Sequence, residues 1–378
     1  MSAQPVPQEP PLIRVSEARE VLAYVPHAMG FQPESSLVAI SLRPPRGRIG
    51  LVARVDLGDV TGVQGDAVAH GLVRHLAADG ASGVFLVVYV PCPLALARRS
   101  TLVRAAVDAV ERAATVPVRD AWVVAADGFA ALRCDDVRCC PETGHPLSEL
   151  GTTQINTAMV VAGSAPLARR RDLRAGQETD PGLLTAFEAA ARAESGRRAR
   201  ARRDGREERW RAAAVRDAVG TLTDAGPRAP GASSTGRTSP ADPVALGRLA
   251  VALRDLQVRD AVIAGLLTSS AVEDEVELLG ALDAMFLPGA PAPDRDRVGR
   301  ARSVLADGVR LARGRTRSRL LGVLAWVSWW CGDGATAQVM AQEALELHGA
   351  DRLALLVEQA LDAGLAPAWV VAARSGGA

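Results

Sequence analysis

Three cysteines and a histidine lie within twelve residues of one another: Cys134, Cys139, Cys140 and His145. Thiolate and imidazole are the side chains that most often bind zinc in proteins. The spacing does not match a zinc finger or ribbon, because adjacent cysteines rarely both reach one tetrahedral ion and no second cysteine pair follows. We therefore expect a packed loop with reduced thiols, and we expect no metal and no other cofactor.

His27 and Cys140 are the candidates for acid–base or nucleophilic chemistry. A histidine titrates near neutral pH and can act as a general base, and Cys140 could form a nucleophilic pair with His145 or His27. A single histidine in a turn is more often a hydrogen-bonding residue, and no third member of a catalytic set is recognisable. Whether the protein is an enzyme stays open at this point.

Arg54 and Asp56 form a second candidate site. They stand two residues apart in an expected strand, so their side chains project from the same face. Such a pair could line an anion-accepting pocket. A solvated face, or a salt bridge between the sheet and a helix, explains the same pattern without a ligand.

The chain contains 44 basic residues and no lysine. Schiff-base enzymes, pyridoxal-phosphate sites and Walker P-loops are excluded, because each requires a lysine. The net charge of +1 excludes a strong overall field for nucleic acid or anionic lipid. Residues 169–211 hold thirteen arginines against eight acidic residues, but a solvated helix with pairs such as Glu194 and Arg198 accounts for them. We expect no specific nucleic-acid binding and no membrane binding.

The periodicity of apolar residues predicts an α/β domain over residues 16–164. The expected order is helix 16–25, strands 36–42 and 49–57, helix 63–79, strand 84–90, helix 95–114, and strands 121–126 and 129–134. The first two strands should form an antiparallel hairpin, and Asp127-Gly128 predicts a type I′ turn between the last two. Crossover helices between the strands indicate a mixed sheet.

Only helices are expected beyond residue 165. Residues 1–15 form a lead-in, 165–223 an Arg-rich helical connector, 224–242 a flexible linker and 243–378 an all-α domain. The expected helices are 180–219, interrupted, then 244–256, 260–267, 273–286, 294–313, 317–330, 333–347 and 351–363.

The last helices follow the spacing of a tetratricopeptide repeat, in which small residues such as Ala337 and Ala344 allow close helix packing. Glu343 should lie on the surface of this array. The expected fold class is therefore α/β plus all-α, a mixed sheet followed by a C-terminal helical-hairpin (TPR-like) domain.

Export and membrane signals are absent from the sequence as given. The first eleven residues lack the basic and apolar regions of a signal peptide, and the apolar run 320–331 is shorter than the roughly 20 residues that span a bilayer. The number of cysteines, five, is odd, which favours reduced thiols. These features predict a cytoplasmic protein.

Three motifs resemble a known family. They are Gly30-Phe31-x-Pro33-x-x-Ser36-Leu37-Val38, Arg54-Val55-Asp56-Leu57 and Cys139-Cys140-Pro141-x-x-Gly144-x-Pro146-Leu147. In this order they are similar to the actinobacterial family DUF4192, a domain of unknown function, and the resemblance covers most of the chain. It implies no chemistry, since the family has no established activity or catalytic residues.

We expect a non-catalytic protein whose C-terminal helices bind a protein partner or a second copy of the chain. The alternative is an enzyme or small-ligand binder with an anion-accepting pocket near Arg54 and Asp56. A concave helical groove would favour the first function, and a deep pocket lined by these two residues would favour the second.

Overall fold

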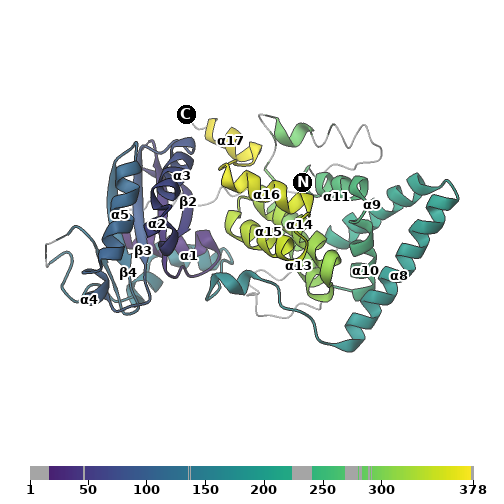
Figure 1. Ribbon diagram of the computed structural model, residues 1–378, viewed down its shortest axis with the longest axis horizontal. Helices are drawn as coiled ribbons and strands as arrows, with labels where there is room; N and C mark the ends of the chain where they lie inside the picture. The colour runs from purple at the N-terminus through teal and green to yellow at the C-terminus, as the bar shows by residue number, and fades with distance from the viewer. Residues whose placement is uncertain are drawn as a thin grey trace, which may run out of the picture. The chain divides into compact units, whose positions relative to one another are not determined.

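The computed structural model describes residues 17–45, 47–134, 136, 138–223, 241–268, 280, 283–287, 290 and 292–375. The chain divides into two compact units, residues 1–169 and 170–378, which we call the α/β unit and the helical unit (Figure 1). The expected lead-in, nearly all of the expected linker and most of the expected helix 273–286 lie outside the described residues.

A five-stranded mixed sheet of order β2-β1-β3-β4-β5 organises the α/β unit. Its strands are β1 (Ser36–Arg43), β2 (Arg48–Asp56), β3 (Gly83–Tyr89), β4 (Val118–Val124) and β5 (Phe129–Ala131). β1 pairs antiparallel with β2 and β3, and β3 pairs parallel with β4, so the expected hairpin and mixed sheet are confirmed. Every residue of β3 is buried, as its continuous apolar sequence predicts for a central strand.

Helices α2 (Leu57–Thr61), α3 (Gly65–Ala78) and α5 (Thr101–Ala113) share one hydrophobic core with one face of the sheet. The short helix α4 (Leu94–Ala97) precedes α5. The expectation of one helix over 95–114 is wrong because the Ser100 side chain accepts a hydrogen bond from the Val103 N–H and starts a new helix. Serine at this position satisfies one of the free N–H groups of a first helical turn.

Helix α1 (Ala18–Met29) continues through Pro26, so the expected end before Pro26 is wrong. The helix ends instead at Gly30, whose φ of 74° is a left-handed conformation that glycine adopts without steric cost. The α/β unit also contains α6 (Ser148–Gly151) and α7 (Gln154–Val161). The Glu20 carboxylate of α1 accepts a hydrogen bond from the Ile155 N–H at 2.9 Å, which ties α1 to the first turn of α7.

The turn between β4 and β5 is not the expected type I′ turn, because neither Asp127 nor Gly128 has a positive φ. Asp127 instead accepts a hydrogen bond from the Leu94 N–H at 2.7 Å. A Cβ atom at Gly128 would stand 2.8 Å from the His145 carbonyl oxygen. Glycine is therefore required here for the close approach of another chain segment, which local sequence does not reveal.

The helical unit contains no strand among its described residues. Its elements are the 3-10 turn η1 (Arg170–Leu173) and the helices α8 (Pro181–Arg203), α9 (Glu207–Thr223), α10 (Pro243–Ala252), α11 (Leu256–Thr268), α13 (Arg295–Leu311), α14 (Gly314–Trp330), α15 (Gly334–Leu347), α16 (Arg352–Asp362) and α17 (Ala368–Ser375). α17 has no counterpart among the expected helices. Within the described ranges, none of the helices combines the length and the apolar character needed to cross a membrane.

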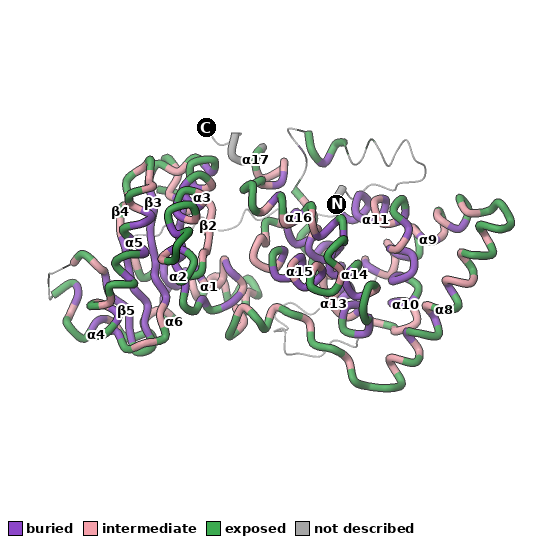
Figure 2. The backbone as a smooth tube through the Cα atoms, in the orientation of Figure 1, coloured by how far each residue is buried: buried purple, intermediate pink, exposed green. Residues whose placement is uncertain are grey.

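The Arg-rich residues 181–223 are part of this helical unit. Phe187 of α8 and Trp210 of α9 lie in the same hydrophobic core as residues of α10, α11 and α13 to α16. Figure 2 shows buried stretches along these helices. The buried Asp255 accepts hydrogen bonds from Arg198 at 2.6 Å and from Arg211 at 3.2 Å. The arginines therefore hold helices together, whereas the sequence suggested a solvated connector.

The expected pair of Glu194 and Arg198 is wrong for the same reason. Glu194 accepts a hydrogen bond from the Trp210 indole at 2.7 Å and pairs with Arg197 at 2.5 Å. Arg198 turns toward Asp255, which also caps the first turn of α11 through the Val258 N–H. A buried charge needs several polar partners, and tertiary partners replace the local helix pair here.

Two helical glycines should respond to alanine substitution in opposite directions, one losing and one gaining stability. A Cβ atom at Gly247 of α10 would collide with the Phe187 carbonyl oxygen and stand 3.0 Å from Ala190, whereas nothing lies within 4 Å of a Cβ at Gly299 of α13. We expect Gly247→Ala to destabilise the protein by about 1 kcal/mol or more, because it overpacks the contact between α8 and α10. Gly299→Ala should stabilise by about 0.5–1 kcal/mol through helix propensity. Urea unfolding of both variants measures the two effects, and equal effects would contradict the close approach of α8 and α10.

Candidate functional site

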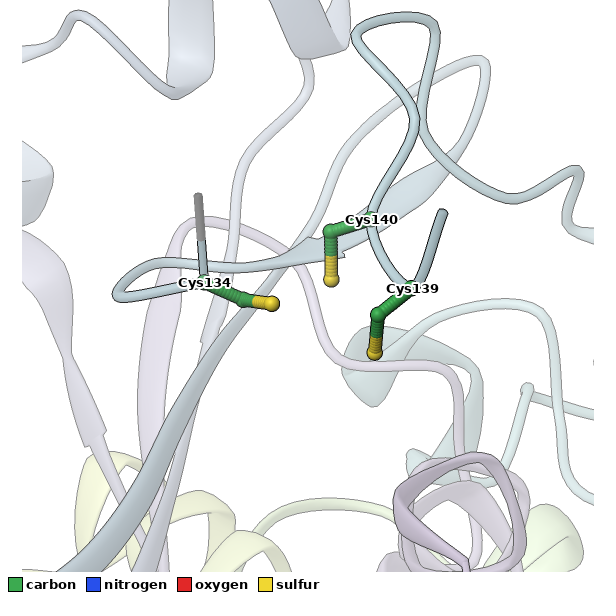
Figure 3. Close-up of side chains that lie close together, drawn as sticks. All are labelled: Cys134, Cys139 and Cys140. Carbon is green, nitrogen blue, oxygen red and sulfur yellow. The ribbon is translucent and has the colours of Figure 1, made fainter. Parts of the chain in front are cut away.

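The three cysteines of the sequence motif meet in space. Their sulfur atoms all lie within 4.8 Å of one another, and Figure 3 shows Cys134 on the segment after β5 and the other two on a neighbouring loop, with the side chains extending into the same region. The N–H groups of Cys139 and Cys140 both donate to the Asp136 carbonyl oxygen, at 3.0 and 2.7 Å. This tight turn brings adjacent cysteines to one place, which spacing alone does not predict.

The three thiols differ in exposure. Cys140 is only 2% exposed, Cys134 is half-buried and Cys139 is exposed. Burial raises the pKa of Cys140 to about 11, and a hydrogen bond from the Ala131 backbone acts in the opposite direction. Because the thiolate is the reactive form, a thiol with this pKa is a poor nucleophile at neutral pH.

His145 lies in the same loop, but its ring contacts the backbone. Its Nε2 donates to the Cys139 carbonyl oxygen at 2.9 Å, and its Nδ1 is 3.6 Å from Glu149. The ring also stacks on Phe129. These contacts hold the loop against β5 and do not aim either ring nitrogen at the Cys140 sulfur, so the geometry gives no support to a Cys140–His145 nucleophilic pair.

Both ring nitrogens of His27 are occupied. Nδ1 is 2.9 Å from the Ser164 hydroxyl and Nε2 is 2.9 Å from the Asn156 amide oxygen. The neutral ring satisfies both bonds if Nε2–H donates to Asn156 and Nδ1 accepts from Ser164. His27 therefore links α1 to α7 and to the segment after it, and no ring nitrogen is left to accept a proton from a substrate.

Arg54 and Asp56 bond to each other, with Arg54 Nη2 donating to Asp56 Oδ1 at 2.6 Å. In the register of the sheet Ser36 stands opposite both Asp56 and Tyr89, so these side chains share a face. The Ser36 hydroxyl, the Arg54 Nε and the Tyr89 hydroxyl are buried without a hydrogen-bond partner. The sequence identified Arg54 and Asp56 but missed Ser36 and Tyr89, whose signal is a polar group within an otherwise apolar strand.

A groove of about 440 Å³ crosses three helices of the helical unit. It is lined by Glu194 of α8, by Ala214, Arg216, Asp217, Ala218, Gly220 and Thr221 of α9, and by Ala245, Arg248, Leu249 and Ala252 of α10. Sequence reasoning missed this surface, because small residues on separate helices carry no functional signal until packing brings them together.

The family model for a domain of unknown function, DUF4192, matches residues 19–368. The chain belongs to the DUF4192 family. The resemblance seen in the three motifs is thereby confirmed. No curated protein and no solved structure matches the chain.

All the candidate residues of this DUF4192 protein fall within the matched span. Of the positions expected from sequence, the structure joins Arg54 to Asp56 and gathers the three cysteines. The ring of His27 hydrogen-bonds to Asn156 and to Ser164.

Proposed function

We propose that this DUF4192 protein is a non-catalytic interaction protein of the cytoplasm, and that its helical unit binds an acidic segment of a protein partner. The groove across α8, α9 and α10 is the observation that carries this proposal. Its volume of about 440 Å³ falls in the range of sites that hold a small molecule or a few side chains. Five free cysteines suit a reducing compartment.

The chemistry of the groove indicates the kind of segment. Ala218, Leu249 and Ala252 are buried and form an apolar floor. Arg216 and Arg248 are exposed beside it, and in the part of the chain that the structure describes neither guanidinium takes part in an ion pair. Arginine forks bind carboxylates in a bidentate manner. A short segment with a small apolar side chain, and with acidic residues that face the two arginines and not Asp217 of the lining, complements this surface.

The packing of the last helices supports a tetratricopeptide-like array at the C-terminal end of the helical unit. α14 packs against both α15 and α16, and α15 packs against α16. Gly322 of α14 allows a close approach, because a Cβ there would stand 2.8 Å from the Asp351 carboxylate and 3.6 Å from the Ala354 nitrogen. Arrays of this kind present extended surfaces to partners, which fits an adaptor.

Charge reversal in the groove tests the proposal. The full chain is used to capture a partner, and the affinity of that partner's acidic segment is then measured by calorimetry. We expect Arg216→Glu combined with Arg248→Glu to weaken binding by about tenfold or more, because two attractive pairs worth up to about 1 kcal/mol each become repulsive. Arg352→Glu reverses one exposed charge on α16, outside the lining of the groove, and should leave the affinity unaltered. Equal affinities for all three proteins would remove the groove as the binding surface.

Self-association through the C-terminal helices is the second form of this interaction. Leu356 of α16 is 51% exposed and Leu365, which follows α16, is 60% exposed, and exposed apolar side chains on a helical array offer a surface for association. Sedimentation velocity should show a concentration-dependent dimer that Leu356→Glu abolishes. Leu256 of α11 is 55% exposed, so Leu256→Glu is the matched control and should leave the dimer intact. A monomer at all concentrations would exclude self-association.

Anion binding in the α/β unit is a second candidate function. The unpartnered donors of Ser36, Arg54 and Tyr89 could together bind a carboxylate or phosphate. We favour the groove because these donor atoms are buried from solvent and Arg54 already pairs with Asp56. A rise in melting temperature with inorganic phosphate that Arg54→Met removes would reverse this preference.

A further inference from the structure

The sulfur cluster on the α/β unit is unused by the proposed interaction. Cys134, Cys139 and Cys140 come from two chain segments, and their sulfur atoms lie within 4.8 Å of one another. We propose that these three cysteines bind one Zn²⁺ ion as thiolates, with a fourth ligand supplied from the solvent side. This assignment concerns a different unit from the proposed groove and does not depend on it.

The geometry fits a tetrahedral site. Zinc–sulfur bonds of about 2.3 Å place the sulfurs of a tetrahedral ion about 3.8 Å apart. The observed limit of 4.8 Å needs only small side-chain rotations to reach this separation. Thiolates are soft ligands that favour zinc over magnesium or calcium.

The backbone around the cluster is arranged to hold the ligands. The turn at Asp136 presents Cys139 and Cys140 on the same side through two backbone hydrogen bonds. Gly144 closes the loop with a φ of 70°, and the Phe129–His145 bridge fastens it to β5.

The cysteines differ in exposure, and this difference indicates that the ion would lie at the protein surface. Cys140 is buried and Cys139 is exposed, so an ion held between them has protein on one side and solvent on the other. The solvent side leaves a position for water or for a ligand from outside. Zinc sites with three protein ligands keep such an open position.

Zinc binding must displace the thiol protons. One Zn²⁺ binding to three protonated thiols releases three protons and forms a site with one net negative charge. β5 is only three residues long, so the ion would join the segment after it to the loop that covers this edge of the sheet. The metal would therefore stabilise the fold locally as well as offer a coordination position.

Cobalt titration of the full untagged chain tests the site. The protein is stripped with a chelator under reducing conditions, titrated with Co²⁺ and then with Zn²⁺. We expect one Co²⁺ per chain, with sulfur-to-cobalt charge-transfer absorption and the visible bands of a four-coordinate ion, all lost when Zn²⁺ replaces the cobalt. Cys139→Ser and Cys140→Ser should each lose the signal.

Two cysteines outside the cluster are the matched controls. Cys92 and Cys331 are free, half-buried thiols, and Cys92→Ser and Cys331→Ser should retain the full cobalt signal. Because Cys139 is exposed, Cys139→Ser should fold normally, as circular dichroism will verify, even if Cys140→Ser does not. A stripped protein without a stoichiometric thiolate–cobalt signal, or a signal that persists in Cys139→Ser, overturns the proposal. A disulfide within the cluster of the protein as purified from reducing cytoplasm would also overturn it.

Discussion

Arg317→Ala should lower the free energy of unfolding by about 3–5 kcal/mol. Arg317 is 3% exposed and Glu343 is 8% exposed, and the Arg317 Nε donates to Glu343 Oε1 at 3.0 Å. The guanidinium also donates to the Val309 carbonyl oxygen at 2.7 Å. Removing the arginine leaves a buried carboxylate without its counter-charge, which is the costly way to break such a pair.

Replacing both residues shows how much of the lost stability comes from leaving one charge buried without a partner, and how much from the ion pair itself. The double variant Arg317→Met, Glu343→Leu should lose far less stability than Arg317→Ala, because neither charge is left buried. Urea unfolding followed by tryptophan fluorescence measures all the variants. If Arg317→Ala lowers the free energy of unfolding by less than about 1 kcal/mol, the value typical of surface ion pairs, the buried pair is contradicted. The same structure makes the expectation of an exposed Glu343 wrong.

Ala337→Leu should destabilise the protein strongly. Overpacking a core costs about 1–3 kcal/mol, and we expect a loss of stability near the upper end of that range. Ala337 and Ala344 of α15 are fully buried, and the Ser318 hydroxyl of α14 donates to the Ala344 carbonyl oxygen at 2.9 Å. This contact requires the two helix backbones to lie close together. A leucine side chain at position 337 has no space and must push α14 and α15 apart.

Ala212→Leu is the control for this change. Ala212 is exposed in α9, so the same substitution there should alter stability by less than about 0.5 kcal/mol. Thermal melts of both variants give the comparison. Indistinguishable melting temperatures for Ala337→Leu and the unaltered protein would rule out close packing of α14 on α15.

Local signals predicted much of the fold. The continuous apolar run of β3 identified the central strand, and aspartates such as Asp180 and Asp242 marked helix starts because their carboxylates accept hydrogen bonds from the first free N–H groups. These features depend on neighbours in sequence. They were therefore visible without any tertiary structure.

The errors have both local and tertiary causes. Pro26 lies inside α1 because Gly30, four residues later, provides the end of the helix. Asp255 attracts Arg198 and Arg211 from helices distant in sequence, so two arginines expected in solvent are half-buried and paired with a buried carboxylate.

The candidate sites show the same division between local and tertiary signals. Arg54 and Asp56 share a strand, and alternation alone places them on one face. The meeting of Cys134 with Cys139 and Cys140 depends on a turn held by the Asp136 carbonyl oxygen. The groove depends on three helices packing together, and no spacing in the sequence encodes it.

Photo-crosslinking from the groove tests the proposed function most directly. A photoreactive amino acid replaces Thr221, which lines the groove, or Arg352, which is exposed on α16, and the full chain is irradiated in the cells that produce it. Our proposal predicts a single protein adduct from position 221, absent from position 352, with the crosslinked peptide in an acidic segment of the partner. Combined Arg216→Glu and Arg248→Glu should abolish that adduct. An absence of any adduct from position 221, or the same adducts from both positions, would contradict the interaction function.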